Sequence, residues 1–368
     1  MIQVESFFNF FKKNKVDFFS GVPDSVLKDT KEILSKKSKS NHIIAANEGT
    51  AASICLGYYL STGKISCLYL QNSGLGNAIN PLISIAHKKV YSIPLLMLIG
   101  WRGAPGQKDE PQHLVKGKIT KKLLDSLDIK YCHIKSERDF KILKKLLIFS
   151  KKNKKPVACL ISKNTFYSNF KSRKILQRHG VKREDFIRNL LIQVKKSTRI
   201  ISTTGYTSRE LYQIRHDEKF KKGKDFYMVG GMGHASSVAL GVSLRKKNSN
   251  IICLDGDGAL IMHLGSLANI GFYAEKNFKH IVLNNYCHES VGGQSTNIEN
   301  INLKNLSSSC GYKKYFMISN LRKMNITLKK FLNSTGPSFL EVKIKSGILR
   351  NLKRPKELFR IKNKFMEK

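Results

Sequence analysis

One carboxylate of the chain, Asp257, stands between two glycines directly after a short apolar run, in the segment CLDGDGALIMHLG (253–265). Glycines at 256 and 258 let the backbone approach a ligand closely, and the start of a following helix offers unpaired N–H groups to a phosphate. The segment lacks the Gly-Lys-Ser/Thr of a Walker loop, and Ile261 breaks the G-x-G-x-x-G dinucleotide pattern. Taken alone, it is compatible with a tight structural turn or with a phosphate–metal site.

A second candidate ligand, Asn285, follows the next apolar run, HIVLNNY. A strand–helix–strand unit of about 30 residues returns the chain to the neighbouring strand, so we expect Asp257 and Asn285 at adjacent strand ends. One carboxylate and one amide oxygen are too few ligands for calcium. They suit Mg²⁺, which prefers six oxygens and takes some of them from a bound phosphate group. The spacing therefore favours a metal-bridged diphosphate.

The elements that must position these ligands follow a rhythm that occurs in both halves of the chain. Short apolar runs are each followed by Gly or Asn and a helix-period stretch, which predicts an α/β fold of two doubly wound parallel-sheet domains. At 368 residues the chain is long enough for both cores. We expect the first domain over 1–166, a polar, basic linker over 167–185 and the second domain over 186–368, ending in a basic tail.

The formal net charge of +40 raises the alternative of a nucleic-acid or membrane partner. The lysines are spread in pairs along the whole chain, without zinc-finger spacing, an RNP-like aromatic motif or a basic heptad region. We therefore expect no specific nucleic-acid partner, and the longest apolar run (90–101) is too short to span a membrane. Seven scattered cysteines without a CxxC pair, and a start without a signal-peptide pattern, predict reduced thiols in a cytoplasmic protein.

The combination of GDG with the downstream NN resembles the motif of thiamine-diphosphate enzymes. The resemblance implies thiamine diphosphate and Mg²⁺ as cofactors, with Asp257, Asn285 and the backbone carbonyl of Cys287 holding the metal. GGMGHASSVALG (230–241) is similar to the upstream part of the same domain, although Met232 alone would be compatible with core packing. The residues that the resemblance places against the cofactor are Glu48, Gly230, Met232, His234, Gly256, Asp257, Gly258, Ala259 and Asn285.

Glu48, in ANEGTAASICLGYYLSTGK, resembles the glutamate by which this family contacts the aminopyrimidine ring. Such a carboxyl group shares a proton with the ring nitrogen, so Glu48 is the first catalytic candidate; in isolation it would be a charge at a helix N-terminus. The cationic ring of the cofactor accepts the electrons when CO₂ leaves a 2-keto acid. The family usually pairs the pyrimidine-binding half of one chain with the diphosphate-binding half of another. We therefore expect a homo-oligomer of at least two chains, with the active site at the subunit interface.

Only a pyrimidine-type half and a diphosphate-type half are present, with no middle domain, and this compact arrangement resembles the phosphonopyruvate decarboxylases. The resemblance is carried by FFSGVPDSVLKD (18–29), QNSGLGNAINPL (71–82), GWRGAPGQKDEPQH (100–113) and VGGMGHASSVALG (229–241). It implies non-oxidative decarboxylation of 3-phosphonopyruvate to phosphonoacetaldehyde and CO₂ in phosphonate biosynthesis. A sulfopyruvate decarboxylase is the near alternative. An acetolactate-type carboligase and a basic nucleic-acid-associated protein on a degenerate scaffold are more distant ones.

A small anionic 2-keto acid requires cations and hydrogen-bond donors, and the segment after the 90–101 run supplies them. The candidates for substrate binding in this segment are Arg102, Lys108, His113 and Lys116, with Lys118 nearby. Arg102 is the first choice, because a guanidinium can bind two phosphonate oxygens at once. Asp24 and His113 resemble the proton-transferring residues of related decarboxylases, although Asp24 after Pro23 is equally a helix N-cap. His263 and His288 lie near the cofactor motifs.

Overall fold

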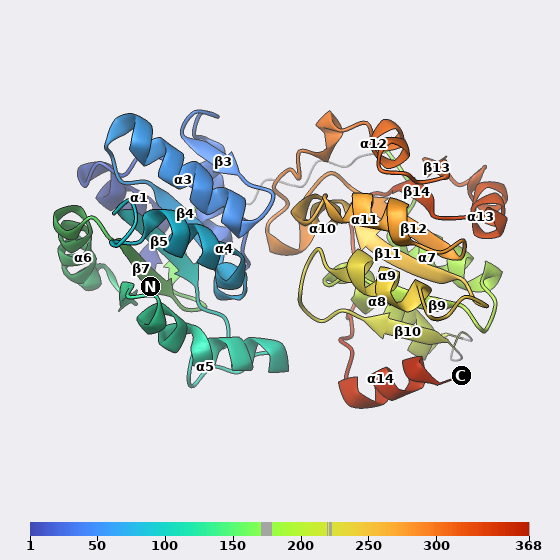
Figure 1. Cartoon of the computed structure of the whole chain (residues 1–368). Helices are drawn as coiled ribbons and strands as arrows, with labels where there is room; N and C mark the ends of the chain where they lie inside the picture. Colours follow the sequence, from blue (N-terminus) through green and yellow to red (C-terminus); the bar gives the residue numbers. More distant parts are fainter. Residues whose placement is uncertain (171–178, 219, 221–222, 368) are drawn as a thin grey trace. The chain divides into compact units, whose positions relative to one another are not determined.

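The computed structural model describes residues 1–170, 179–218, 220 and 223–367, and it divides the chain into two compact units, Met1–Arg173 and Lys174–Lys368. Each unit is built around one six-stranded sheet in which all paired neighbours are parallel (Figure 1). The predicted linker, 167–185, includes residues 171–178, which lie outside the described residues. The division into 1–166, 167–185 and 186–368 stays a prediction.

Strands and helices alternate along the first unit. Its sheet contains β2 (Phe19–Gly21), β3 (His42–Ile44), β4 (Cys67–Gln71), β5 (Leu95–Gly100), β6 (Lys130–Ile134) and β7 (Pro156–Ile161). Its helices are α1 (Val4–Lys13), α2 (Lys31–Ser35), α3 (Glu48–Thr62), α4 (Leu75–Pro81), α5 (Pro111–Ser126) and α6 (Phe140–Asn153). A short parallel pair, β1 (Ile2–Gln3) and β8 (Phe166–Tyr167), joins the beginning of the unit to its end.

Helices cover both faces of this sheet, which is why its strands are apolar throughout rather than alternating. Side chains of α1 and α6 form one core with alternate strand residues, to which Phe7, Leu98 and Leu143 belong. Side chains of α3, α4 and α5 form the other core, to which Leu56 and Met97 belong. Because successive side chains of a strand point to opposite faces of the sheet, each strand contributes to both hydrophobic cores of the unit.

The second unit repeats this plan. Its sheet contains β9 (Arg199–Ser202), β10 (Lys224–Tyr227), β11 (Ile251–Gly256), β12 (Phe278–Asn284), β13 (Lys314–Ile318) and β14 (Ser338–Lys343). Its helices are α7 (Arg183–Gln193), α8 (Tyr206–Asp217), α9 (Ala235–Ser243), α10 (Asp257–Met262), α11 (Ser266–Tyr273), α12 (Leu303–Ser309), α13 (Met324–Asn333) and α14 (Leu358–Met366). The predicted basic tail folds back onto the sheet, because Phe365 of α14 packs against Phe226 of β10.

The two sheets have the same strand order. Counted in chain order within each unit, the strands lie second, first, third, fourth, sixth and fifth, as β3-β2-β4-β5-β7-β6 and as β10-β9-β11-β12-β14-β13. The order reverses beside the first strand, between β2 and β4 and between β9 and β11. Open α/β sheets bind their ligands at such a point, outside the carboxyl ends of the strands. The predicted fold of two doubly wound parallel-sheet domains is confirmed.

Two further expectations concern the chain as a whole. Within the described ranges, no helix combines the length and the apolar character that crossing a bilayer requires. All seven cysteines belong to those ranges and are free thiols, as the absence of paired spacing predicted.

Candidate functional site

The metal-ligand candidates of the second unit lie at the carboxyl edge of its sheet. Asp257 begins α10 directly after β11, and Asn285 follows the end of β12. The strand register pairs Gly256 with Leu283, so both candidates leave adjacent strands at the same edge. The backbone N–H of Tyr286 is near enough to the Asp257 carboxylate to lower its pKa. The structure therefore brings Asp257 beside the segment that starts at Asn285.

The Asp257 carboxylate is buried among uncharged groups. Burial raises its pKa to about 7, and this rise is opposed by Thr296 Oγ1, which donates a hydrogen bond of 2.9 Å to Oδ2, and by backbone N–H groups. When only neutral hydrogen-bond donors stabilise the negative charge of a buried carboxylate, a cation that binds beside it stabilises that charge further. Asn285 Oδ1 and the Cys287 carbonyl are the neutral, hard oxygens that Mg²⁺ prefers. The donor set therefore fits the metal that the sequence resemblance implies.

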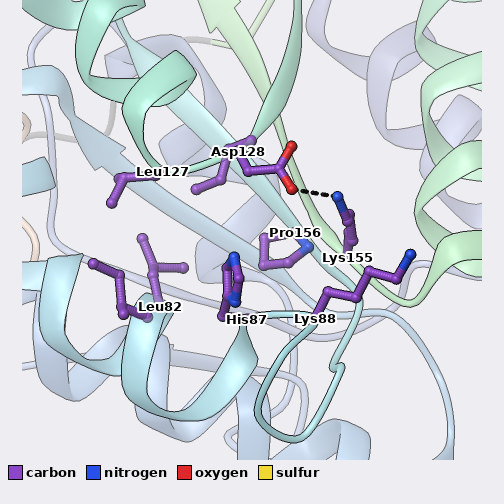
Figure 2. Close-up of a pocket in the computed structure, with 9 residues that line it drawn as sticks. Leu82, His87, Lys88, Leu127, Asp128, Lys155 and Pro156 are labelled. Atoms are coloured by element: carbon purple, nitrogen blue, oxygen red, sulfur yellow. Dashed lines mark hydrogen bonds and ion pairs between the residues drawn. The ribbon is translucent and has the colours of Figure 1, made fainter.

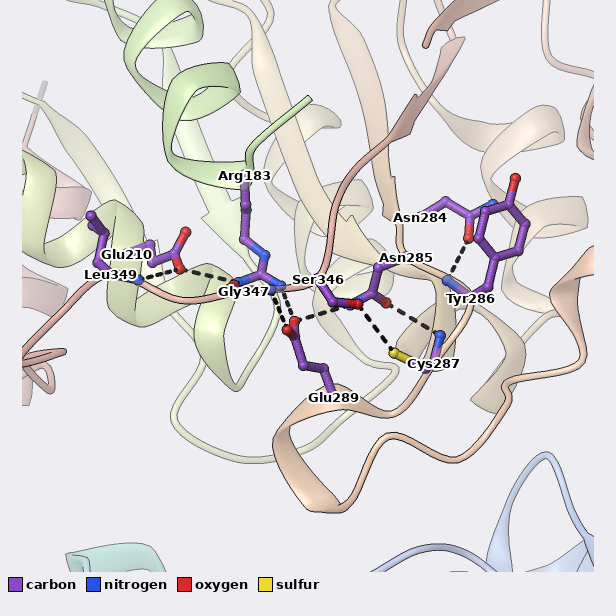
Figure 3. Close-up of polar contacts among 10 residues, drawn as sticks. All are labelled: Arg183, Glu210, Asn284, Asn285, Tyr286, Cys287, Glu289, Ser346, Gly347 and Leu349. Carbon is purple, nitrogen blue, oxygen red and sulfur yellow. Dashed lines mark hydrogen bonds and ion pairs between the residues drawn. The ribbon is translucent and has the colours of Figure 1, made fainter. Parts of the chain in front are cut away.

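The amide of Asn285 is held at both ends (Figure 3). Its Nδ2 donates to Glu289 Oε2 at 3.0 Å, and its Oδ1 accepts from the backbone N–H of Cys287 at 3.3 Å. The N–H of Glu289 donates in turn to the Cys287 carbonyl at 2.9 Å. Tyr286 between them has a positive φ of 64°, which bends the chain sharply after β12. This turn places Asn285 and Cys287 at the same edge of the sheet as Asp257, which follows β11.

Bare backbone lies beside these ligands at Gly258. A Cβ atom there would stand 2.8 Å from His288 Nδ1 and 3.3 Å from the methyl carbon of Met232. Met232 and His288 therefore approach the start of α10 from two different loops, and any residue larger than glycine would collide with His288. Burial lowers the pKa of His288 to about 4, so its ring is neutral near pH 7. Glycine at 258 keeps the backbone open to a ligand between these side chains.

The loop that carries Gly230 and His234 packs on α10. A Cβ atom at Gly233 would stand 2.5 Å from His263 Cδ2 and 3.1 Å from the carbonyl oxygen of Ala259. The exposed ring of His234 stacks on His263 with ring centroids 4.3 Å apart. The predicted approach of His234 to a diphosphate stays a prediction, since its ring contacts another histidine here.

Two threonines of this half were not among the sequence candidates. Thr203 follows β9 at the switch point, where its buried Oγ1 has no hydrogen-bond partner among the described residues. Its methyl carbon lies 3.9 Å from a Cβ position at Gly256, beside the diphosphate turn. The run TTG at a strand end is a usable sequence signal for Thr203. Thr296 gives no such signal, because its contact with Asp257 spans 39 residues through an irregular loop.

In the first unit, Glu48 begins α3 behind the N-cap Asn47, whose side chain accepts a hydrogen bond from the Thr50 N–H at 2.9 Å. The Glu48 carboxylate is buried and accepts a hydrogen bond of 2.7 Å from Asn77 Nδ2. Burial lowers the pKa of Lys116, and the Glu48 carboxylate opposes this change, so the two side chains are electrostatic neighbours. Two sequence candidates, one for catalysis and one for substrate binding, are thus close enough within this unit for their charges to interact.

Asp24 follows β2 and lies over the bare backbone of Gly100, where a Cβ atom would overlap its carboxyl group. Burial raises the pKa of Asp24 to about 6 against the opposing charge of Arg102. Oδ2 accepts a hydrogen bond of 3.1 Å from the Val26 N–H, and the buried Oδ1 has no partner among the residues described. The next helical turn begins only at Lys28, so Asp24 caps a turn rather than an α-helix.

The guanidinium of Arg102 is engaged within the protein. Its Nε donates to Asp109 Oδ2 at 2.6 Å and its NH2 to Asp109 Oδ1 at 2.5 Å, while NH1 donates to Ser25 Oγ at 3.0 Å. Burial would raise the pKa of Asp109, but the bonds from Arg102 outweigh it and keep the carboxylate ionised. The prediction that Arg102 binds a phosphonate through two oxygens therefore requires Asp109 to leave the guanidinium.

The remaining substrate candidates differ in exposure. His113 lies half-buried in the first turn of α5 and is among the groups that lower the pKa of Asp109. Lys108 is exposed, and so is Lys118. The structure thus groups Glu48 with Lys116, and separately places Asp24 and His113 beside the Arg102–Asp109 pair, whereas Lys108 points to solvent.

One pocket of the first unit lies at the other edge of its sheet (Figure 2). Its walls come from residues that precede β5 and β6 and from the beginning of β7, and Asp128 accepts a hydrogen bond from Lys155 within it. The lining residues are Leu82, Ile83, His87, Lys88, Leu127, Asp128, Ile129, Lys155 and Pro156. Because Glu48 and Asp24 follow the carboxyl ends of strands, this pocket is not part of the candidate site.

Comparison with known proteins places both halves of the chain. Residues 3–127 match the family model of the thiamine pyrophosphate enzyme N-terminal TPP binding domain, and residues 203–342 match that of the C-terminal TPP binding domain. The interval between the matches contains β6, α6 and β7, which complete the first unit, and α7 and β9, which begin the second. The predicted absence of a middle domain is therefore confirmed for the described residues.

Three relatives extend this result. Phosphonopyruvate decarboxylase of Streptomyces viridochromogenes is 33% identical over 357 residues, covering 92% of this chain and 87% of the relative. Sulfopyruvate decarboxylase of Methanosarcina acetivorans is 27% identical, covering 91% of this chain and 89% of the relative. In Methanococcus maripaludis, the alpha and beta subunits of sulfopyruvate decarboxylase match 40% and 39% of this chain, and 86% and 74% of their own lengths, at 37% and 32% identity. The chain belongs to the thiamine pyrophosphate enzyme family, as a homologue of the phosphonopyruvate decarboxylases.

Proposed function

We propose that the chain is a carboxy-lyase that uses thiamine diphosphate and Mg²⁺ to convert 3-phosphonopyruvate into phosphonoacetaldehyde and CO₂, in phosphonate biosynthesis. The observation that carries the proposal is 33% identity to a phosphonopyruvate decarboxylase over 92% of the chain. Sulfopyruvate is the second candidate substrate, because a sulfopyruvate decarboxylase aligns over a similar length at 27% identity. The higher identity favours the phosphonate. A phosphonate also carries up to one more negative charge than a sulfonate, which suits the basic segment 102–118.

In the diphosphate-type half, the proposed metal ligands are Asp257, Asn285 and the Cys287 carbonyl. When bound, thiamine diphosphate supplies the electron-accepting ring that decarboxylation needs. The buried Asp257 carboxylate binds the cation, and Thr296 fixes one of its oxygens at 2.9 Å. The residues that we propose to line the cofactor are Gly230, Met232, His234, Gly256, Gly258 and Ala259, and we add Thr203 because its buried hydroxyl has no hydrogen-bond partner among the described residues.

In the pyrimidine-type half, Glu48 holds and shares the catalytic proton. The hydrogen bond from Asn77 fixes the orientation of its carboxylate, and the surrounding residues exclude water from it. Lys116 lies close enough to interact with the charge of Glu48 and is the cation that we place near the substrate carboxylate. Asp24 and His113 are proposed to carry protons to and from the reacting carbon, and Arg102 to meet the phosphonate in place of Asp109. Lys108 stays a more distant candidate for substrate binding.

We further propose a homo-oligomer in which the pyrimidine-type half of one chain meets the diphosphate-type half of another. Support comes from the relative of Methanococcus maripaludis, whose alpha and beta subunits each match about two fifths of this chain. Two separate polypeptides in that relative thus correspond to parts of the present chain. Symmetric dimers are the commonest soluble homo-oligomers, which makes a dimer the smallest assembly expected.

Phosphorus NMR tests the substrate assignment. Purified protein incubated with thiamine diphosphate, Mg²⁺ and 3-phosphonopyruvate should convert the substrate resonance into that of phosphonoacetaldehyde. A parallel assay measures CO₂ release from sulfopyruvate. Turnover of sulfopyruvate without any phosphonoacetaldehyde signal would replace the proposed substrate by the second candidate, and no turnover of either would refute the decarboxylase assignment.

The variant Glu48→Gln tests the proposed proton-sharing role. An amide retains the size of the side chain but cannot share an acidic proton, so we expect kcat to fall by roughly 10²- to 10⁴-fold. Calorimetric titration with thiamine diphosphate and Mg²⁺ should show binding close to that of the wild type. Asp257→Ala is the opposite control, since it should abolish that binding. Wild-type kcat in Glu48→Gln would disprove the assigned role.

A further inference from the structure

Three charged side chains, Arg183, Glu210 and Glu289, form a cluster beside the candidate metal ligands (Figure 3), and the first two of these residues are buried. Arg183 NH1 lies 3.1 Å from Glu210 Oε1, and NH2 lies 2.5 Å from Glu289 Oε2. The side chains of these residues are only 5%, 1% and 9% exposed. Buried charges persist in folded proteins when they are paired and hydrogen-bonded, as here. The cluster is a built feature of the second unit for which the sequence motifs give no role.

The cluster ties four segments together at the carboxyl edge of the sheet. Arg183 begins α7, Glu210 lies in α8, and Glu289 belongs to the loop after β12. The fourth segment follows β14, where the Gly347 N–H donates to Glu289 Oε1 at 2.5 Å and the Gly347 carbonyl accepts from Arg183 NH1 at 3.1 Å. The Leu349 N–H adds a bond of 3.2 Å to Glu210 Oε1. Glu289 is therefore held in place independently of the loop that carries it.

Glu289 contacts the groups proposed to hold the metal. Its Oε2 accepts the 3.0 Å hydrogen bond from Asn285 Nδ2, and its backbone N–H donates to the Cys287 carbonyl at 2.9 Å. Both carboxylate oxygens are engaged, by Arg183, Asn285 and Gly347, so the Glu289 side chain is not itself placed as a ligand. Glu289 instead influences the proposed metal site through its hydrogen bonds to Asn285 and to the Cys287 carbonyl.

The orientation of the Asn285 amide depends on this contact. An amide has a donor end and an acceptor end of nearly equal size, and its hydrogen bonds decide which end points where. With a carboxylate against Nδ2, the flipped amide would bring two oxygens together. The carbonyl oxygen has two lone pairs, of which the Cys287 N–H takes one. Glu289 thus selects the orientation that leaves the second lone pair of Oδ1 for a cation.

We propose that Glu289, clamped by Arg183, is a positioning residue of the magnesium site that presents Asn285 Oδ1 and the Cys287 carbonyl to the metal. The proposal rests on the proposed function, since it presupposes that Mg²⁺ binds with thiamine diphosphate at Asp257 and Asn285. Groups that orient metal ligands are worth roughly 10- to 100-fold in metal affinity. Arg183 contributes by compensating the charge of Glu289, which would otherwise be a buried, unpaired carboxylate.

Mn²⁺ is the probe for the test, because its free ion is observed directly by electron paramagnetic resonance. Titrations of the whole chain with Mn²⁺ in the presence of thiamine diphosphate should give a roughly 10- to 100-fold larger Kd for Glu289→Gln than for the wild type. Arg183→Lys, which retains the charge but loses the planar fork, should shift the Kd in the same direction by less. At saturating Mg²⁺, kcat of Glu289→Gln should return to within a few-fold of the wild type.

Asp225→Asn is the matched control. Asp225 is also a buried carboxylate paired with an arginine, with Arg215 Nε at 2.6 Å and NH2 at 3.2 Å, and it accepts a further hydrogen bond from the Tyr227 hydroxyl rather than from a proposed metal ligand. The Kd of the Asp225→Asn protein for Mn²⁺ should match that of the wild type, although breaking the ion pair should lower the melting temperature of this variant. Circular dichroism verifies folding. Should Glu289→Gln not fold, Glu289→Asp takes its place, because it keeps the charge for Arg183 while withdrawing the oxygens from Asn285.

Each outcome has a distinct meaning. Mn²⁺ binding that Asp257→Ala abolishes and that Glu289→Gln leaves unchanged would overturn this inference alone. An equal loss of affinity in Asp225→Asn and Glu289→Gln would also overturn it, because general destabilisation would then explain both. Wild-type protein that binds no Mn²⁺ with thiamine diphosphate would overturn the proposed function, and this inference with it.

Discussion

At the scale of single residues, Asp24 shows how the fold controls the charge of one side chain. The carboxyl group is 3% exposed, and burial raises its pKa from the ordinary value of 3.8 to about 6. The Arg102 charge and three backbone N–H groups oppose this rise but do not cancel it. Glycine at position 100 leaves the space that the carboxyl group occupies. Asp24 is thus a group that keeps its proton into the weakly acidic range, as a residue that handles protons must.

The raised pKa of Asp24 predicts a pH-dependent cost to stability. The folded protein binds this proton more tightly than the unfolded chain, so the free energy of unfolding falls as pH rises from about 4 to 6 and stays lower above that range. The shift corresponds to roughly 3 kcal/mol at most. Asp24→Asn, which never ionises, should therefore be more stable than the wild type at pH 7.5 and equal to it near pH 4. Urea unfolding of cofactor-free protein at several pH values measures this, and a difference that does not change with pH would contradict it.

At the scale of elements, the turn between β4 and α4 sets the position of Glu48. Gly74 lies in this turn and faces the Glu48 carboxyl group so closely that a Cβ atom would overlap it. Asn77, one turn further along α4, donates the hydrogen bond that holds the same carboxylate. The turn therefore provides the space, and the helix that follows it provides the donor, for the candidate catalytic group. The turn requires glycine at position 74, because any side chain there would overlap the Glu48 carboxyl group.

Two glycines of this segment should respond differently to alanine. Gly74→Ala should displace Glu48 and lower kcat/KM by roughly 100-fold, since moving a catalytic group by about 1 Å has an effect of this size. Gly76→Ala is the matched control, because a Cβ atom at this exposed helix position would meet nothing within 4 Å. It should leave kcat/KM unchanged and stabilise the fold by about 0.5–1 kcal/mol. Steady-state kinetics and thermal melts of both variants test this, and normal kinetics in Gly74→Ala would contradict the steric argument.

At the scale of the whole molecule, the sequence predicts the sheets and the strand ends better than the loops. Apolar runs with crossover helices determine which strands are neighbours, and for this reason the adjacency of Asp257 and Asn285 was predictable. Their partners Thr296 and Glu289 were not, because their contacts depend on the path of the loop after β12. Arg102 shows the same limit. An arginine in this basic segment suggested a cation available to the substrate, whereas the guanidinium of Arg102 is hydrogen-bonded to Asp109, seven positions away.

The equal strand order of the two units bears on how a complete site is assembled. Each sheet has one switch point, and the candidate residues divide between them, with Glu48 and Asp24 in the first unit and Asp257 and Asn285 in the second. One cofactor with a pyrimidine end and a diphosphate end needs both kinds of half. In the dimer that we propose, two chains together would supply two of each kind, enough for two complete sites.

Mixing two inactive variants tests whether each proposed site is shared between chains. Glu48→Gln is altered in the pyrimidine-type half, and Asp257→Ala is altered in the diphosphate-type half. If the halves of different chains combine, a mixed dimer contains one site with both residues intact and one site with neither. Random mixing makes about half of the dimers mixed, so activity should recover to about one quarter of the wild-type value.

Co-refolded or co-expressed mixtures, with mixed dimers verified by native mass spectrometry, provide the measurement. The matched control mixes Glu48→Gln with Gly74→Ala, both altered in the pyrimidine-type half, and this mixture should recover no more than its two components. If mixed dimers of Glu48→Gln and Asp257→Ala stay inactive, each site is built from one chain alone. The two switch points of a single chain must then serve the same cofactor molecule.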